Sequence, residues 1–135
     1  QNTPFYIVCT DVETGKPVYH QCKDLISRNE LEWVRGSASM PLASQIVSAG
    51  PYKLLDGGIS DSIPLKYSEY KGNAHNVVIL TQPEGYVKKP NSMMPAIRRI
   101  YRNYPNLVRT IERRHLIYNK QLEEKGSKKD GRLCK

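Results

Sequence analysis

The run FYIVCTDVETGKPVYH, residues 5–20, decides how we expect the chain to begin folding. Its first part, residues 5–10, is β-branched or aromatic except at Cys9, which is typical of a buried strand. The polar stretch that follows contains Gly15 and predicts a turn, and residues 18–21 predict a returning strand. The sequence therefore predicts a β-hairpin at the start of the chain.

The same rules place the remaining elements. Asn29 is a predicted N-cap for a short helix, residues 42–47 predict a further helical turn, and residues 52–55 predict a strand. The strand signal is clearest at residues 76–81 (NVVILT), whose apolar middle is typical of a strand covered on both faces in a parallel sheet. From Pro95 onward, apolar residues recur every three or four positions. Pro105 interrupts this pattern, so we expect two helices, the second starting near residues 103–105 and ending before Gly126.

Length and composition limit the class of protein. The chain has 135 residues, which is enough for one domain, and 39% of them are hydrophobic, which is too many for a disordered chain. Its longest aliphatic run, residues 77–80, is far shorter than the roughly 20 residues that cross a bilayer. Cys9, Cys22 and Cys134 are an odd, widely spaced set, which argues against a disulfide framework and a zinc site. We therefore expect a reducing, cytoplasmic setting.

The net charge of +8 is confined to one end of the chain. Residues 1–86 hold 7 basic and 9 acidic residues, whereas residues 87–135 hold 14 basic and 4 acidic residues. Such a region can attract phosphate on nucleic acid or on an anionic membrane surface, or it can be a solvated helix face, which the missing RNA-binding signature favours. The basic candidates for an anionic surface are Lys88, Lys89, Arg98, Arg99, Arg102, Arg109, Arg113 and Arg114.

Asp56, in LLDGG at residues 54–58, is the residue best placed for catalysis. An acid that leaves a strand in an α/β sheet lies where ligands bind, and Gly57 and Gly58 permit close approach of the backbone. Asp-Gly is also a common hairpin turn, and an Asp often caps a turn with its own side chain. Taken alone, the local pattern favours the turn.

Other candidate motifs are weaker. The three histidines lack a metal-ligand spacing, and His115 lies on an apolar helix stripe, so we expect no metal site. The stretch GSASM, residues 36–40, has Met40 where a nucleophile elbow needs glycine, so its serines are interpreted as capping or packing residues. Cys9 is predicted to be a buried thiol, and the sequence has no phosphate-binding loop.

Several motifs occur together in one order: FYIVCTDVETGKPVYH, then RGSASMPL (35–42), LLDGGISDSIPL (54–65) and NVVILTQPEGY (76–86). In this order they resemble the C-terminal half of a bacterial patatin-like phospholipase. The pair Tyr118-Asn119 is similar to that family's pattern as well. The resemblance implies a three-layer α/β/α fold with a mostly parallel sheet, followed by basic amphipathic helices.

The resemblance also implies a function and a division of the chain. It implies acyl-ester or phospholipid hydrolysis by a Ser-Asp dyad without a cofactor, with Asp56 as general base and Gly57 and Gly58 as supporting loop. The sequence has no G-x-S-x-G and no glycine-rich oxyanion segment, so we expect a fragment that is inactive alone. Non-catalytic binding of anionic lipid or nucleic acid is the alternative.

The implied partners and segments follow from the same resemblance. We expect a lipid or acyl-ester substrate, peripheral contact with an anionic membrane, no nucleic acid, and self-association or a companion chain that covers an exposed sheet edge. The expected segments are a hydrolytic core over 1–91, a basic helical segment over 92–125 and a disordered tail over 126–135.

Overall fold

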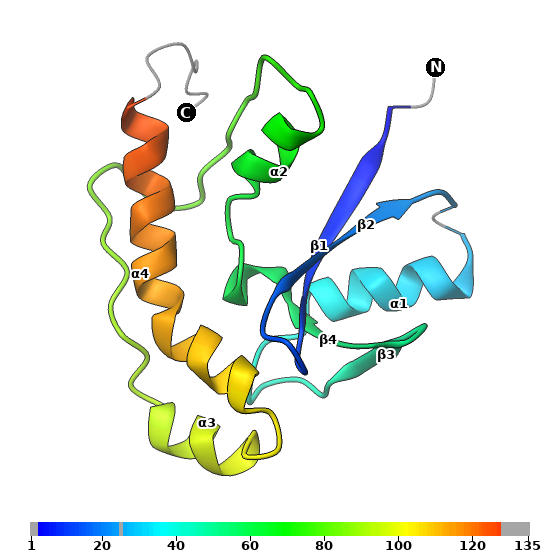
Figure 1. Ribbon diagram of the computed structural model, residues 1–135, viewed down its shortest axis with the longest axis vertical. Helices are drawn as coiled ribbons and strands as arrows, with labels where there is room; N and C mark the ends of the chain where they lie inside the picture. Colours follow the sequence, from blue (N-terminus) through cyan, green and yellow to red (C-terminus); the bar gives the residue numbers. More distant parts are fainter. Residues whose placement is uncertain (1–2, 25, 128–135) are drawn as a thin grey trace.

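The computed structural model describes residues 3–24 and 26–127 (Figure 1). Its elements, in chain order, are β1 (Phe5–Asp11), β2 (Pro17–Cys22), α1 (Arg28–Ser37), β3 (Val47–Ala49), β4 (Tyr52–Asp56), the 3-10 helix η1 (Gly57–Ile59), α2 (Leu65–Tyr70), α3 (Met94–Ile100) and α4 (Pro105–Ser127). The predicted hairpin is confirmed as β1 and β2, and the strand that leads to Asp56 is confirmed as β4.

The four strands form one sheet in the order β2-β1-β4-β3, and each neighbouring pair is antiparallel. The expected mostly parallel sheet of a three-layer α/β/α fold is therefore wrong. Residues 12–16 alone join β1 to β2, and Gly50 and Pro51 alone join β3 to β4. Parallel neighbours need a crossover of about a dozen residues or more, so these short connections enforce antiparallel pairing.

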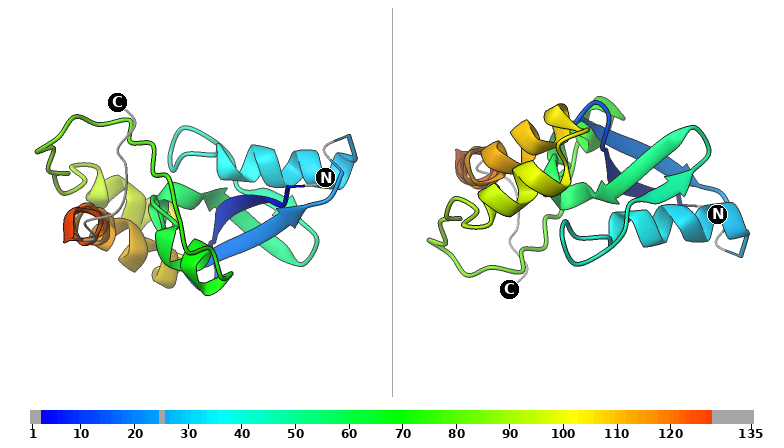
Figure 2. Two further views of the ribbon diagram at one scale, coloured as in Figure 1. Left: turned by 90° about the horizontal axis from the view of Figure 1, so that it is seen from above. Right: turned by 90° about the horizontal axis from the view of Figure 1, so that it is seen from below.

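Helices cover both faces of the sheet (Figure 2). Leu54 of β4 points into a cluster with Trp33 of α1, whereas the next residue, Leu55, points into a cluster with Ile97 of α3 and Ile111 of α4. Successive strand side chains alternate between the two faces, so β4 contributes to both cores. The apolar residues of β1 and β4 therefore reflect an antiparallel sheet that is covered on both sides.

Two local predictions are wrong. Residues 76–81 form no strand in the structure, and Val77 and Ile79 are 68% and 79% exposed, because no described strand pairs with this segment. Residues 42–47, predicted as a helical turn, contain no helix and end at the start of β3. The predicted helix after Asn29 exists as α1, although Ser27 is its N-cap and accepts a hydrogen bond from the Glu30 amide.

The two C-terminal helices are confirmed, with the break at residues 101–104. Helix α4 continues through Gly126 to Ser127, so the predicted end before Gly126 is wrong. A single glycine inside a helix costs only about 1 kcal/mol relative to alanine, which a helix of this length tolerates. The rest of the predicted tail, 128–135, lies outside the described residues. Among the described helices, none is long and apolar enough to cross a membrane.

Candidate functional site

Asp56 is fixed by hydrogen bonds to its backbone on two sides. Its amide donates to the Ser39 carbonyl at 2.8 Å, and its carbonyl accepts from the Thr10 hydroxyl at 2.8 Å. Thr10 is fully buried on β1 and Ser39, just after α1, is 4% exposed. The end of β4 is therefore tied both to the neighbouring strand and to the segment that follows α1.

The Asp56 carboxylate caps the turn that follows it. Its Oδ1 accepts the Gly58 amide at 2.7 Å, which makes Asp56 the N-cap of η1. The predicted hairpin turn at Asp-Gly is not formed, whereas the capping role is confirmed. The second oxygen, Oδ2, makes no hydrogen bond with any described residue. The hydrogen bond to Oδ1 thus fixes the position of the carboxylate.

The two glycines after Asp56 meet different neighbours. A Cβ on Gly57 would lie 2.2 Å from the Val8 carbonyl oxygen, so this position has room only for glycine against β1. A Cβ on Gly58 would lie 3.2 Å from both Arg114 Nη2 and Asp56 Oδ1. Gly57 therefore lets η1 pack against β1, and the Arg114 guanidinium of α4 lies beside the turn that holds Asp56.

A second carboxylate, Asp61, is close to this turn and was not predicted from the sequence. It is 9% exposed, and both of its oxygens accept hydrogen bonds, one from the Tyr19 hydroxyl and the other from Gln121 Nε2 at 2.6 Å. Its partners come from β2 and α4, so the bonded group ties distant elements together. Both oxygens of Asp61 are occupied, so we interpret this residue as one that holds the fold together. Its partners lie 42 and 60 residues away in the sequence, so no local pattern could predict the group.

A groove of about 450 Å³ runs beside the turn, along the first half of β1. Its wall includes Tyr6 and Val8 of β1, Ser37 of α1, and both Gly57 and Gly58. The Ser37 hydroxyl donates to the Val8 carbonyl at 2.8 Å, so it serves packing, as the sequence indicates.

Cys9 lies directly opposite Asp56 in the ladder but cannot replace the missing nucleophile. Its side chain is fully buried and donates to the Trp33 carbonyl at 3.4 Å. Burial, followed by the negative charge of Asp56, raises the pKa of this thiol to about 12. The raised pKa keeps the thiol protonated near neutral pH, and the prediction of a buried thiol at Cys9 is confirmed.

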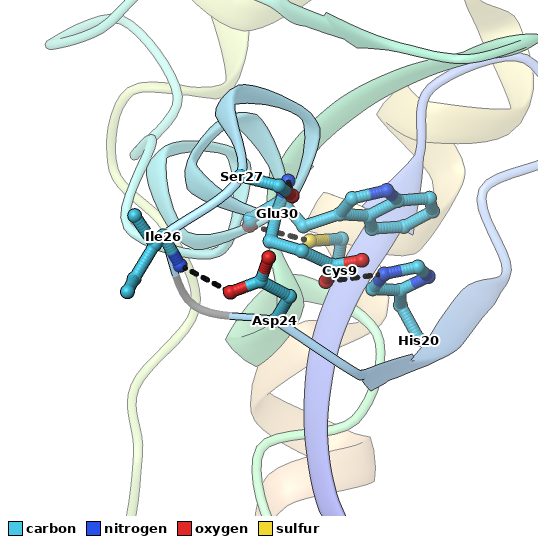
Figure 3. Close-up of polar contacts among 7 residues, drawn as sticks. Cys9, His20, Asp24, Ile26, Ser27 and Glu30 are labelled. Carbon is cyan, nitrogen blue, oxygen red and sulfur yellow. Dashed lines mark hydrogen bonds and ion pairs between the residues drawn. The ribbon is translucent and has the colours of Figure 1, made fainter.

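A second polar cluster joins β2 to α1 (Figure 3). His20 Nε2 contacts Glu30 Oε2 at 2.8 Å, and the His20 ring stacks on Trp33 with 4.1 Å between ring centroids. The pKa of Glu30 is lowered, chiefly by a hydrogen bond from the Cys22 thiol. Burial acts in the opposite direction and raises it, whereas His20 and Lys23 lower it further. No described group of His, Cys, Asp and Glu side chains could hold a metal ion.

The predicted basic residues do not form one site. Most are exposed, and Arg98 pairs with Glu112 of α4 at 2.9 Å, which suits a solvated helix surface. Lys88 and Arg114 differ because both are half-buried and line one cleft, to which Lys89 also contributes. The exposed members are Lys89, Arg98, Arg99, Arg102, Arg109 and Arg113.

Tyr118 and Asn119, the pair identified in the sequence, hold the long segment between α2 and α3 against α4. The Asn119 side chain accepts the Lys88 amide at 2.8 Å and donates to the Lys88 carbonyl at 3.0 Å. The Tyr118 ring meets the Tyr86 ring edge-on, and Lys88 Nζ lies 5.3 Å from its centroid. The pair thus anchors a segment that has no helix or strand of its own (Figure 1).

No protein-family model matches the chain, and no curated protein matches it.

Proposed function

We propose that this chain supplies the general base of an acyl-ester hydrolase, with Asp56 activating a serine that comes from outside residues 1–135. The carrying observation is the position of Asp56: one carboxylate oxygen is bound to the Gly58 amide, and the other has no hydrogen bond among the described residues. Gly57 and Gly58, which follow Asp56 directly, line a groove whose wall also includes Asp61. The resemblance to patatin-like phospholipases supports the same residue and the same chemistry.

The proposed chemistry needs only the carboxylate and an incoming serine. Asp56 Oδ2 takes the proton from the serine hydroxyl while the serine oxygen attacks the ester carbonyl. Collapse of the tetrahedral intermediate returns the proton to the departing alcohol and leaves the acyl group on the serine. Water then attacks the acyl-serine while Asp56 takes a proton from it. Collapse of the second tetrahedral intermediate returns this proton to the serine oxygen and releases the acid.

The open edge of β1 offers a place for the segment that carries the serine. The Val12 amide bonds the Lys53 carbonyl of β4, so by ladder alternation the amides of Tyr6 and Val8 face the same side. Pairing between β1 and β4 stops at Cys9, because β4 ends at Asp56. Tyr6 therefore faces the groove, where an extended segment could pair with it, whereas the Val8 carbonyl already accepts the Ser37 hydroxyl and packs against Gly57.

A second unpaired stretch supports a companion segment. Residues 76–80 have no ladder partner, and Val77 and Ile79 project into solvent. Burying two such side chains is worth roughly 1.5–3 kcal/mol each. A companion segment that contacts residues 76–80 would gain this free energy by covering the two side chains.

The test compares the chain alone with the whole product of its gene, using p-nitrophenyl butyrate and dihexanoylphosphatidylcholine as substrates. We expect no turnover by the chain alone, hydrolysis by the whole product, and a loss of about 10³-fold or more in kcat for Asp56→Asn. Asp24→Asn is the matched control, because the Asp24 carboxylate is exposed and accepts a hydrogen bond from the nearby Ile26 amide alone among the described residues.

Two results would overturn the proposal. Activity retained by Asp56→Asn would remove Asp56 from the chemistry. A whole gene product that neither hydrolyses the esters nor reacts with a fluorophosphonate probe would leave no serine for Asp56 to activate.

A further inference from the structure

A cleft of about 370 Å³ lies between α4 and the segment that runs from Tyr86 to Ser92. Its wall carries the cationic side chains of Lys88, Lys89 and Arg114, together with the His115 ring. No Asp or Glu lines it. The cleft is therefore a concave surface of one sign of charge, which favours an anionic ligand.

Two polar atoms at this cleft lack a partner. Arg114 Nε and His115 Nδ1 are buried and make no hydrogen bond within the described chain. A buried polar group without a partner costs about 1–3 kcal/mol, so most buried polar groups in folded proteins are bonded. Arg114 Nε is itself too buried for a ligand to reach, but the Arg114 side chain lines the cleft, and the guanidinium fork matches the geometry of a phosphate with several acceptor oxygens.

One wall of the cleft is joined to α4 by the hydrogen bonds already described. Asn119 binds both backbone polar groups of Lys88, so this lysine is fixed at the wall. Burial, and then the charge of Arg114, lowers the pKa of Lys88, while Asp56 raises it. Two cations are therefore crowded together with a single carboxylate nearby, a distribution of charge that an anion would balance.

We propose that this cleft binds a phosphate group, with the Arg114 guanidinium and the Lys88 ammonium as its ligands. Arg114 Nη2 and Asp56 Oδ1 each lie 3.2 Å from the position of a Cβ on Gly58, so the phosphate would be held next to the candidate general base. Identifying it as the phosphate of a lipid headgroup rests on the proposed function. The phosphate site itself does not need that function.

The test measures binding to the full chain at low salt by NMR, with two probes. Inorganic phosphate represents a free anion, and dihexanoylphosphatidic acid, kept below its micelle concentration, represents a lipid headgroup. Arg114→Gln should weaken binding of both probes about 10-fold or more, because it removes charge-assisted hydrogen bonds. Arg113→Gln is the control, since it removes the same charge from an exposed position one residue earlier on α4.

We expect Arg113→Gln to weaken binding less than about twofold, as for a screened surface charge. Lys88→Gln is a second variant, for use if Arg114→Gln unfolds the chain. It should also weaken the binding of both probes. Tighter binding of the lipid than of inorganic phosphate would identify a headgroup site, and equal binding would identify a site for free phosphate; both results support the proposal.

Equal losses of affinity for Arg113→Gln and Arg114→Gln would overturn the proposed phosphate site and favour diffuse attraction to the basic surface. The absence of binding of either probe would also overturn it. Because binding is measured without turnover, an inactive gene product would refute the proposed function and leave this result intact.

Discussion

Replacing Gly57 by alanine tests how the Asp56 turn is held against the sheet. The new Cβ would lie 2.2 Å from the Val8 carbonyl oxygen and 2.6 Å from the Val8 carbonyl carbon. These atoms belong to the backbone of the inner strand β1, which cannot rotate away as a side chain can. The backbone of Gly57 is outside the left-handed region, so the whole effect comes from this contact.

The structure sets the size of the effect. Overpacking a well-packed site costs about 1–3 kcal/mol, and contact with strand backbone places Gly57→Ala at the upper end, about 3 kcal/mol. Gly58→Ala is the control, because its Cβ would meet only side-chain atoms, Arg114 Nη2 and Asp56 Oδ1 at 3.2 Å each, and no strand backbone. Both substitutions restrict the backbone of the unfolded chain to the same extent. The difference in free energy of unfolding between the two variants therefore reports the contact with Val8.

Urea unfolding followed by Trp33 fluorescence measures this difference. Trp33 is the only tryptophan and is 5% exposed, so its emission reports unfolding directly. With an m-value of about 1.5 kcal/mol per molar urea, Gly57→Ala should lower the midpoint by about 2 M, and Gly58→Ala by less than about 0.5 M. Equal midpoints for the two variants would refute the close packing of Gly57 on β1.

The remaining predictions concern three other parts of the molecule. Asn119→Leu removes both bonds to Lys88, so hydrogen exchange of the Lys88 amide should rise about 10- to 100-fold; an unchanged rate would show that other contacts hold the segment. The pKa of Glu30 is lowered, so its ionised form stabilises the fold at pH values above the ordinary pKa of 4.5. This stabilisation is lost as the pH falls through the lowered pKa. The urea midpoint should therefore fall more steeply from pH 7 to pH 3 in the native sequence than in Glu30→Gln, and equal slopes would contradict this. Replacing Val77 and Ile79 by serine should reduce self-association in sedimentation velocity, because both are exposed and apolar; unchanged association would place the contact elsewhere.

Much of the local structure could be predicted because its signals are local. The hairpin of β1 and β2, strand β4 and the break before Pro105 each depend on residues adjacent in sequence. The candidate acid, Asp56, was also visible, because a carboxylate before two glycines at a strand end is a short pattern.

The strand predicted at residues 76–81 shows where that reasoning fails. Its apolar residues satisfy the pattern of a strand, yet a strand forms only where a neighbouring strand accepts its hydrogen bonds. No described segment lies in position to do so, and the stretch remains irregular with Val77 and Ile79 exposed.

The amino-acid sequence by itself determined the hairpin, the helices α1, α3 and α4, and the identity of the candidate acid, since each follows from periodicity, turn residues or a short motif. Tertiary structure alone decided the antiparallel pairing of β1 with β4, the fit of Gly57 against Val8, and the contact of Arg114 with the Asp56 turn. These features join residues that are far apart in the chain, and their energies come from packing and hydrogen bonds that exist only after the elements assemble.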